Sequence, residues 1–107
     1  MKPKEFRKYL NRDGGKCLHC GATEGLVPQH RGNRGMGGSK ERDVPSNVIV
    51  FCSSFNSLVE SSGTAARYAK GYGWKISTYA DPLKIPVYDV TAQGWFMMDN
   101  GFSRWAV

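Results

Sequence analysis

The sequence predicts an α+β domain, in which a small ββα core carries an N-terminal helix and is followed by a C-terminal antiparallel β-meander. Two short apolar runs, at residues 26–30 and 48–52, stand on either side of a glycine-rich connection, and a helical pattern follows the second run. Residues 76–107 carry Val, Tyr, Trp and Phe in short runs between turn-forming residues. Short apolar runs bounded by turn signals are typical of strands, and this pattern gives the expected layout.

Local signals set the expected elements. Phe6 and Leu10 stand four residues apart and share one face of an N-terminal helix. Gly63 is a weak point in the helix that follows the second apolar run, and Asn100-Gly101 is the tight turn between the last two strands. In chain order we expect a helix at 4–11, strands at 26–30 and 48–52, a helix at 53–71, and strands at 86–90, 94–98 and 103–106.

The length and charge favour one domain with a polyanionic partner. A chain of 107 residues suits a core at 1–75 with an extension at 76–107 packed on the same domain. Residues 1–75 carry 13 of the 15 Lys and Arg and 6 of the 9 Asp and Glu, a net charge of +7, whereas residues 76–107 carry −1. This asymmetry points most simply to nucleic acid, and a solvated charged surface is the simpler alternative.

Composition also indicates the compartment. The sequence has no apolar run long enough to span a membrane, and its basic N-terminus lacks the apolar stretch of a secretory signal. Three cysteines, an odd number, argue against a disulfide framework and suit a reducing cytosol. We therefore expect a cytoplasmic protein with no membrane partner.

The cysteines form half of a zinc motif. Cys17-x-x-Cys20 followed by glycine has the spacing of a structural zinc knuckle. Cys52 offers a third ligand, but Phe55 stands where a second Cys-x-x-Cys would place the fourth. His19 lies inside the knuckle and is expected to point away from a metal held by its neighbours. An incomplete Zn²⁺ site and cysteines packed as small apolar side chains around Phe55 both stay open.

The connection at 31–44 is both glycine-rich and basic. Glycine lets the main chain lie close to a phosphate, and Arg and Lys neutralise its charge. The connection lacks the Gly-Lys-Ser/Thr ending of a nucleotide-binding loop. A flexible solvated loop is the alternative to a nucleic-acid contact. The basic residues expected to hold phosphates are Arg31, Arg34, Lys40 and Arg42.

Residues around this connection carry the groups that phosphodiester hydrolysis needs. A histidine at a strand end, His30, can activate water as a base. Asn56 and Glu60 are four residues apart on one helix face and offer the oxygen ligands that Mg²⁺ or Mn²⁺ prefers. Two simpler interpretations stay open: His30 as a surface histidine, and a capping box of Ser57 and Glu60 that leaves Asn56 outside the helix.

The order of these motifs resembles the HNH endonuclease family, and especially the small HNH-like proteins encoded by phages of actinobacteria. The resemblance implies a ββα-metal fold, metal-dependent cutting or nicking of DNA, and the host cytoplasm as the location. It spans about residues 10–65 and rests on Arg12-Asp13-Gly14-Gly15, Cys17-x-x-Cys20, Gln29-His30-Arg31, Pro45-Ser46-Asn47, Cys52 and Asn56.

The resemblance also implies roles for single residues. His30 matches the general base, and Gln29 occupies the metal-ligand position before it. Asn47 matches the central asparagine, whose role is to fix the loop so that the base keeps its orientation; ordinary turn chemistry is the alternative for Asn47. Asn56 matches the last histidine, a place where HNN-type variants carry asparagine. Apart from the resemblance, Glu60 or the substrate phosphate is the expected source of negative charge for the divalent ion, because Gln29 and Asn56 are neutral.

Departures from the family pattern give two further hypotheses. Gln29 and Asn56 are neutral, and a carboxamide oxygen is a poorer Mg²⁺ ligand than a carboxylate. Phe55 breaks the zinc knuckle. A degenerate HNH domain that binds nucleic acid or a host protein without cutting is therefore the second hypothesis. A zinc-dependent domain like those of transcription factors is the third, and the missing fourth ligand counts against it.

Overall fold

The computed structural model describes residues 1–33 and 42–107 of the chain. These residues form three α-helices and two small antiparallel sheets, which confirms the predicted α+β class. The elements are α1 (Pro3–Asp13), β1 (Leu26–His30), η2 (Pro45–Asn47), β2 (Val48–Cys52), α2 (Ser53–Ser61), α3 (Gly63–Gly71), η3 (Pro82–Lys84), β3 (Val87–Asp89), β4 (Gly94–Met98) and β5 (Arg104–Ala106).

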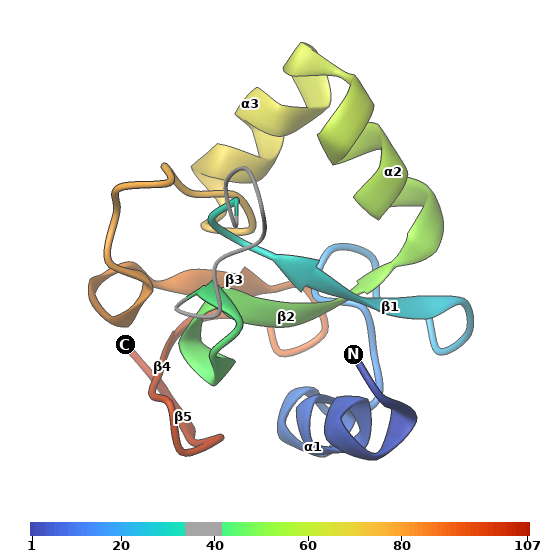
Figure 1. The fold of residues 1–107 in the computed structure, drawn as a ribbon, viewed down its shortest axis with the longest axis vertical. Coiled ribbons are helices and arrows are strands. Elements are labelled where there is room, and N and C mark those ends of the chain that lie inside the picture. The colour runs from blue at the N-terminus through green and yellow to red at the C-terminus, as the bar shows by residue number, and fades with distance from the viewer. Residues whose placement is uncertain (34–41) are drawn as a thin grey trace.

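The β1–β2 hairpin is the centre of the fold. Its strands pair antiparallel, from Leu26 opposite Cys52 to His30 opposite Val48. Residues 48–51 of β2 are fully buried, as expected for a continuous apolar run covered on both faces. Figure 1 shows α2 and α3 on one side of the hairpin and α1 on the other, so β2 forms the middle of the core. Both strands were predicted with these bounds.

The helix predicted at 53–71 is two helices, so the prediction of one helix was wrong. The chain is extended at Ser62, with φ −121° and ψ 121°, and the Ser62 side chain accepts a hydrogen bond from the main-chain N–H of Ala65. A serine in this position is a favoured N-cap, and Gly63 directly after it has a low helix propensity. The break turns the chain between α2 and α3, as Figure 1 shows.

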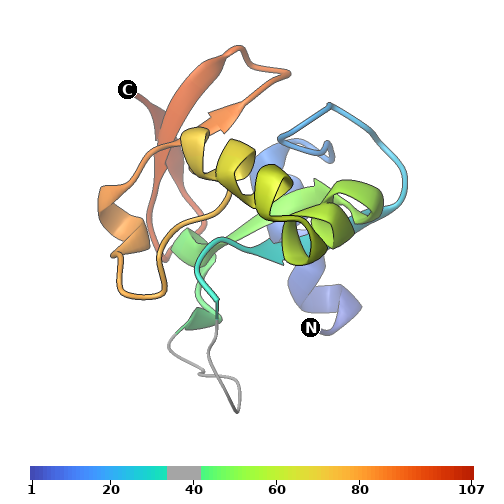
Figure 2. The same ribbon diagram turned by 90° about the horizontal axis from the view of Figure 1, so that it is seen from above.

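The C-terminal meander was predicted in its strands but not in its last turn. The sheet order is β3-β4-β5, with Val87 opposite Phe96 and Met98 opposite Arg104. Residues 99–103 join β4 to β5, a longer connection than the two-residue turn expected at Asn100-Gly101. The reason is Asp99, whose carboxylate accepts two main-chain N–H groups within the turn. Figure 2 shows the meander on one side of the molecule.

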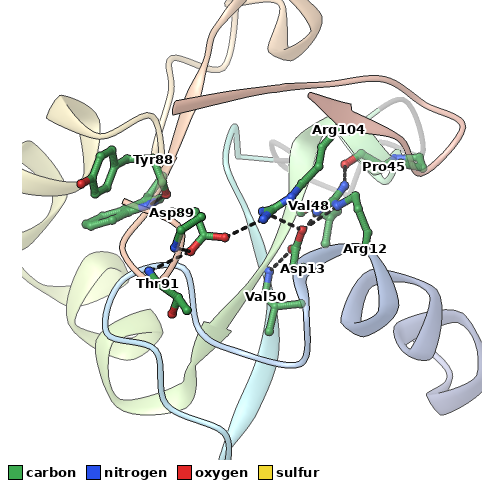
Figure 3. A network of polar contacts seen from close by, with 11 residues as sticks. Arg12, Asp13, Pro45, Val48, Val50, Tyr88, Asp89, Thr91 and Arg104 are labelled. Carbon is green, nitrogen blue, oxygen red and sulfur yellow. Dashed lines mark hydrogen bonds and ion pairs between the residues drawn. The ribbon is translucent and has the colours of Figure 1, made fainter. Parts of the chain in front are cut away.

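A buried polar network joins the helix before the core to the meander after it (Figure 3). Asp13, at the end of α1, pairs with Arg12 at 2.8 Å and accepts the main-chain N–H of Val50 at 3.2 Å. Arg12 also donates to carbonyl oxygens of η2 and β2. Arg104 of β5 pairs with Asp89 of β3 at 2.8 Å and approaches Asp13 at 3.8 Å. These contacts connect α1, β2, β3 and β5 without an apolar side chain.

One glycine is required by a close main-chain approach. Gly73 has φ +72°, and a Cβ there would lie 2.1 Å from the Pro86 carbonyl oxygen. The left-handed conformation costs a non-glycine residue about 1–2 kcal/mol, and overpacking adds about 1–3 kcal/mol. We expect Gly73→Ala to lower the free energy of unfolding by about 3 kcal/mol, measured by urea denaturation.

The control for this prediction is Gly71→Ala at the end of α3. A Cβ at Gly71 meets nothing within 4 Å, so this variant is expected to keep the wild-type stability to within about 0.5 kcal/mol. Equal stability of both variants would contradict the steric argument for Gly73.

Candidate functional site

His30 lies at the end of β1, beside a carboxylate that the sequence analysis missed. Its Nε2 is 3.1 Å from Oδ1 of Asp43, and its side chain is 23% exposed. A carboxylate only accepts hydrogen bonds, so Nε2 carries the shared proton and Nδ1 is left as the basic nitrogen. Asp43 lies near the end of the basic connection at 31–44, and no local pattern singles it out. The pairing depends on the return of the chain toward β2.

Asn47 holds together the two ends of the connection between β1 and β2. The residue is fully buried. Its Oδ1 accepts the main-chain N–H of Gly32 at 2.8 Å, and its Nδ2 donates to the carbonyl oxygens of Gly32 and Arg42 at 3.0 and 2.8 Å. These three bonds use most of the hydrogen-bonding capacity of the amide. Asn47 therefore positions the chain on both sides of the loop, directly after His30.

Gln29 and Asn56, which the resemblance puts at metal-ligand positions, are in contact. Asn56 is on α2 and donates through Nδ2 to Oε1 of Gln29, which is buried on β1. The Gln29 amide nitrogen in turn donates to the Trp74 carbonyl oxygen at 3.4 Å. The hairpin and the first helix of the ββα unit thus bring together two amide groups that are 27 residues apart.

Glu60 is paired with a lysine that sequence reasoning missed. The Lys75 ammonium is 3.2 Å from Oε1 of Glu60 and also donates to Oδ1 of Asn33. Lys75 is buried, whereas the Glu60 side chain is 53% exposed. Asn56 and Glu60 both lie inside α2, whose N-cap is Cys52. The alternative in which Glu60 closes a capping box with Ser57 was therefore wrong.

Arg31 serves the fold, which corrects the expectation that it contacts phosphate. Its side chain is fully buried. Burial and the neighbouring Arg12 lower its pKa to about 10, so the guanidinium stays charged at neutral pH. Every nitrogen of the guanidinium donates to main-chain carbonyls, those of Gly73, Ser46, Pro82, Ile85 and Pro86. A group with all its donors occupied inside the protein is not available to a ligand.

The other three basic residues of the connection are Arg34, Lys40 and Arg42. Arg42 is half-buried and donates to the Ala80 carbonyl oxygen at 3.0 Å. Arg34 and Lys40 lie outside the described residues. The expected phosphate contacts of these three residues stay predictions.

The structure also gathers the cysteines and a histidine. Ligand atoms of Cys17, His19, Cys20 and Cys52 all lie within 4.8 Å of one another. The expectation that His19 points away from this cluster was therefore wrong. Burial raises the pKa of the Cys17 thiol to about 12 even though three main-chain N–H groups lower it, and burial lowers the pKa of His19. The sequence signal for a substitute ligand was Phe55, which stands where a second Cys-x-x-Cys would place its cysteine.

No protein-family model, curated protein or solved structure matches the chain. The relation to HNH enzymes therefore stays a resemblance carried by the residues named above. Among the described residues, no helix is long and apolar enough to cross a membrane.

Proposed function

We propose that the chain is an HNH-type nuclease that hydrolyses or nicks DNA phosphodiesters with the help of a divalent metal ion, with His30 as the general base. The observation that carries the proposal is the Nε2–Asp43 contact of 3.1 Å. A histidine whose Nε2–H is bound to a carboxylate presents Nδ1 to a water and is stabilised when it takes up the proton. Asn47 supports this role because it fixes the main chain just after the base.

The residues proposed to hold Mg²⁺ or Mn²⁺ are Gln29, Asn56 and Glu60. Their oxygen atoms are of the kind that these ions prefer, and Gln29 and Asn56 lie next to each other, as two ligands of one ion must. A bound divalent ion supplies Lewis-acid stabilisation of the scissile phosphate. One carboxylate and two amides make a weak site, so we expect substrate phosphate to strengthen metal binding.

The net charge supports a nucleic acid as the partner, and the resemblance to HNH enzymes makes DNA the proposed substrate. Residues 1–75 carry +7, as counted above, and this part of the chain contains β1, β2 and α2. A positive domain attracts a polyanion over a range set by the salt concentration. Arg42, with Arg34 and Lys40, is proposed to contact phosphates.

A second candidate is a degenerate HNH domain that binds nucleic acid or a host protein without cutting. Two contacts favour it: Lys75 neutralises the Glu60 carboxylate, and the amides of Gln29 and Asn56 bond to each other. A site in this state offers little negative charge to a cation. Trp95 and Trp105 of the meander are partly exposed and suit a protein partner.

Cleavage of supercoiled plasmid by the full chain tests both candidates. Wild-type protein is incubated with Mg²⁺, Mn²⁺ or EDTA, and the same DNA is used in a mobility-shift assay over a range of salt. Nicking that requires metal supports the nuclease. A salt-dependent shift without nicking supports the binding module, and neither nicking nor a shift, on DNA or on RNA, would contradict the assignment of a nucleic-acid partner.

A further inference from the structure

The loop that carries Cys17 and Cys20 is folded as a tight knuckle. The Gly21 N–H donates to the Cys17 carbonyl oxygen at 2.8 Å, and Gly21 adopts φ +76°, a conformation that glycine takes at no steric cost. The Cys17 sulfur accepts main-chain N–H groups from His19 at 3.3 Å and from Cys52 at 3.1 Å. Hydrogen bonds from main-chain N–H groups to this sulfur favour negative charge on it, which a metal-bound thiolate carries.

The His19 ring is packed between aromatic side chains, and one of its nitrogens has no hydrogen-bond partner among the described residues. The ring stacks on Phe55, with centroids 3.8 Å apart and planes 4° apart, and it is nearly perpendicular to the Trp74 ring, with centroids 5.3 Å apart. Among the described residues, His19 Nδ1 is buried and has no hydrogen-bond partner. An unsatisfied buried polar atom costs about 1–3 kcal/mol. A metal ion bound at Nδ1 would remove this cost, and the three thiols of the cluster indicate which kind of metal ion fits.

The four ligand atoms are close to the arrangement of a tetrahedral zinc site. With Zn–S of about 2.3 Å and Zn–N of about 2.0 Å, the ligand atoms of a tetrahedron stand about 3.5–3.8 Å apart. Here they lie within 4.8 Å of one another. To reach this geometry, the most widely separated pair of ligand atoms has to approach by about 1 Å. Three sulfurs and an imidazole nitrogen are a typical structural Zn²⁺ donor set.

We infer that Cys17, Cys20, Cys52 and His19 form a complete structural Zn²⁺ site, in which His19 replaces the cysteine that is missing at position 55. Phe55 does not leave the site open, because its ring forms the flat surface on which the His19 imidazole is oriented. Two departures from a four-cysteine motif therefore compensate each other.

The site is placed to stabilise the junction of both sheets. Leu18, inside the knuckle, donates its N–H to the Val50 carbonyl oxygen at 3.1 Å and accepts the Val90 N–H at 3.0 Å. Cys52 ends β2 where α2 begins. A metal held here ties the knuckle to the ββα unit and to the meander. Small domains commonly depend on such a metal because their cores are limited.

Metal analysis of the full-length protein tests the inference without any assay of cleavage. The chain is produced with Zn²⁺ and purified without chelators, and zinc is measured by elemental analysis. The protein is then titrated with Co²⁺ to read the ligand set from its absorption spectrum. We expect one zinc per wild-type chain and a tetrahedral cobalt spectrum with three sulfurs and one nitrogen. His19→Ala is expected to weaken metal binding by at least about 10-fold.

Two variants make the outcome decisive. His30→Ala removes the other histidine of the chain and is expected to keep the zinc and the cobalt spectrum of the wild type. His19→Cys is expected to bind tightly with the spectrum of a four-sulfur site, and it decides the question even if His19→Ala does not fold. Wild-type protein without stoichiometric zinc, or a cobalt spectrum unchanged in His19→Cys, would overturn the inference and leave the nuclease proposal standing.

Discussion

His30→Ala is expected to lower the rate of metal-dependent plasmid nicking by about 10²–10⁴-fold, the usual contribution of a positioned general base. The imidazole is the group proposed to take the proton from the attacking water, and alanine offers no substitute. The side chain is partly exposed, and its described partner is the Asp43 carboxylate. The variant should therefore keep its fold and its DNA affinity. The measurement is a time course of nicking, with urea denaturation and a mobility shift as checks on fold and binding.

Asp43→Ala separates positioning from catalysis. Asp43 is proposed to act through the imidazole of His30, so its loss should lower kcat while KM for DNA stays near the wild-type value. The loss should be smaller than that of His30→Ala, because the base itself is still present. Nicking by His30→Ala at the wild-type rate would remove His30 from the proposed mechanism. A rise in KM without a fall in kcat for Asp43→Ala would make Asp43 a DNA contact instead.

Arg31→Leu is expected to lower the free energy of unfolding by at least about 4 kcal/mol, because it leaves several buried carbonyl groups without donors. The guanidinium donates to main-chain carbonyls of segments that are far apart in the sequence, such as those of Ser46 and Ile85. Domains of this size are stable by about 5–15 kcal/mol, so the variant should be mostly unfolded in mild denaturant. Urea denaturation followed by circular dichroism measures the effect.

Arg42→Leu is the matched control, because Arg42 is half-buried and its side chain donates to a single described carbonyl, that of Ala80. Its loss of stability should stay within about 1 kcal/mol. Arg31→Lys should be nearly as unstable as Arg31→Leu, since a lysine cannot reproduce the planar fork of donors. A stable Arg31→Leu variant with weaker DNA binding and a reduced salt dependence would restore the phosphate role expected from the sequence.

Features that depend on residues close together in the sequence were predictable. The two strands of the hairpin and the three strands of the meander follow from short apolar runs between turn residues. The cysteine spacing correctly indicated that Cys17, Cys20 and Cys52 meet. Errors arose where a side chain competes with the main chain over a few residues. Ser62 caps a new helix, and Asp99 closes a longer turn than the Asn-Gly pair suggested.

The sequence by itself determined the α+β class, the order of the elements and the gathering of three cysteines, because periodicity, turn residues and ligand spacing act over short distances. Only the tertiary structure decided what the charged and imidazole groups do. Arg31 is buried and donates hydrogen bonds to main-chain carbonyls of distant segments. Asp43 is the partner of His30. His19 was brought to the cysteines. Such contacts are set by how distant segments pack, and a linear pattern of residue types does not contain that information.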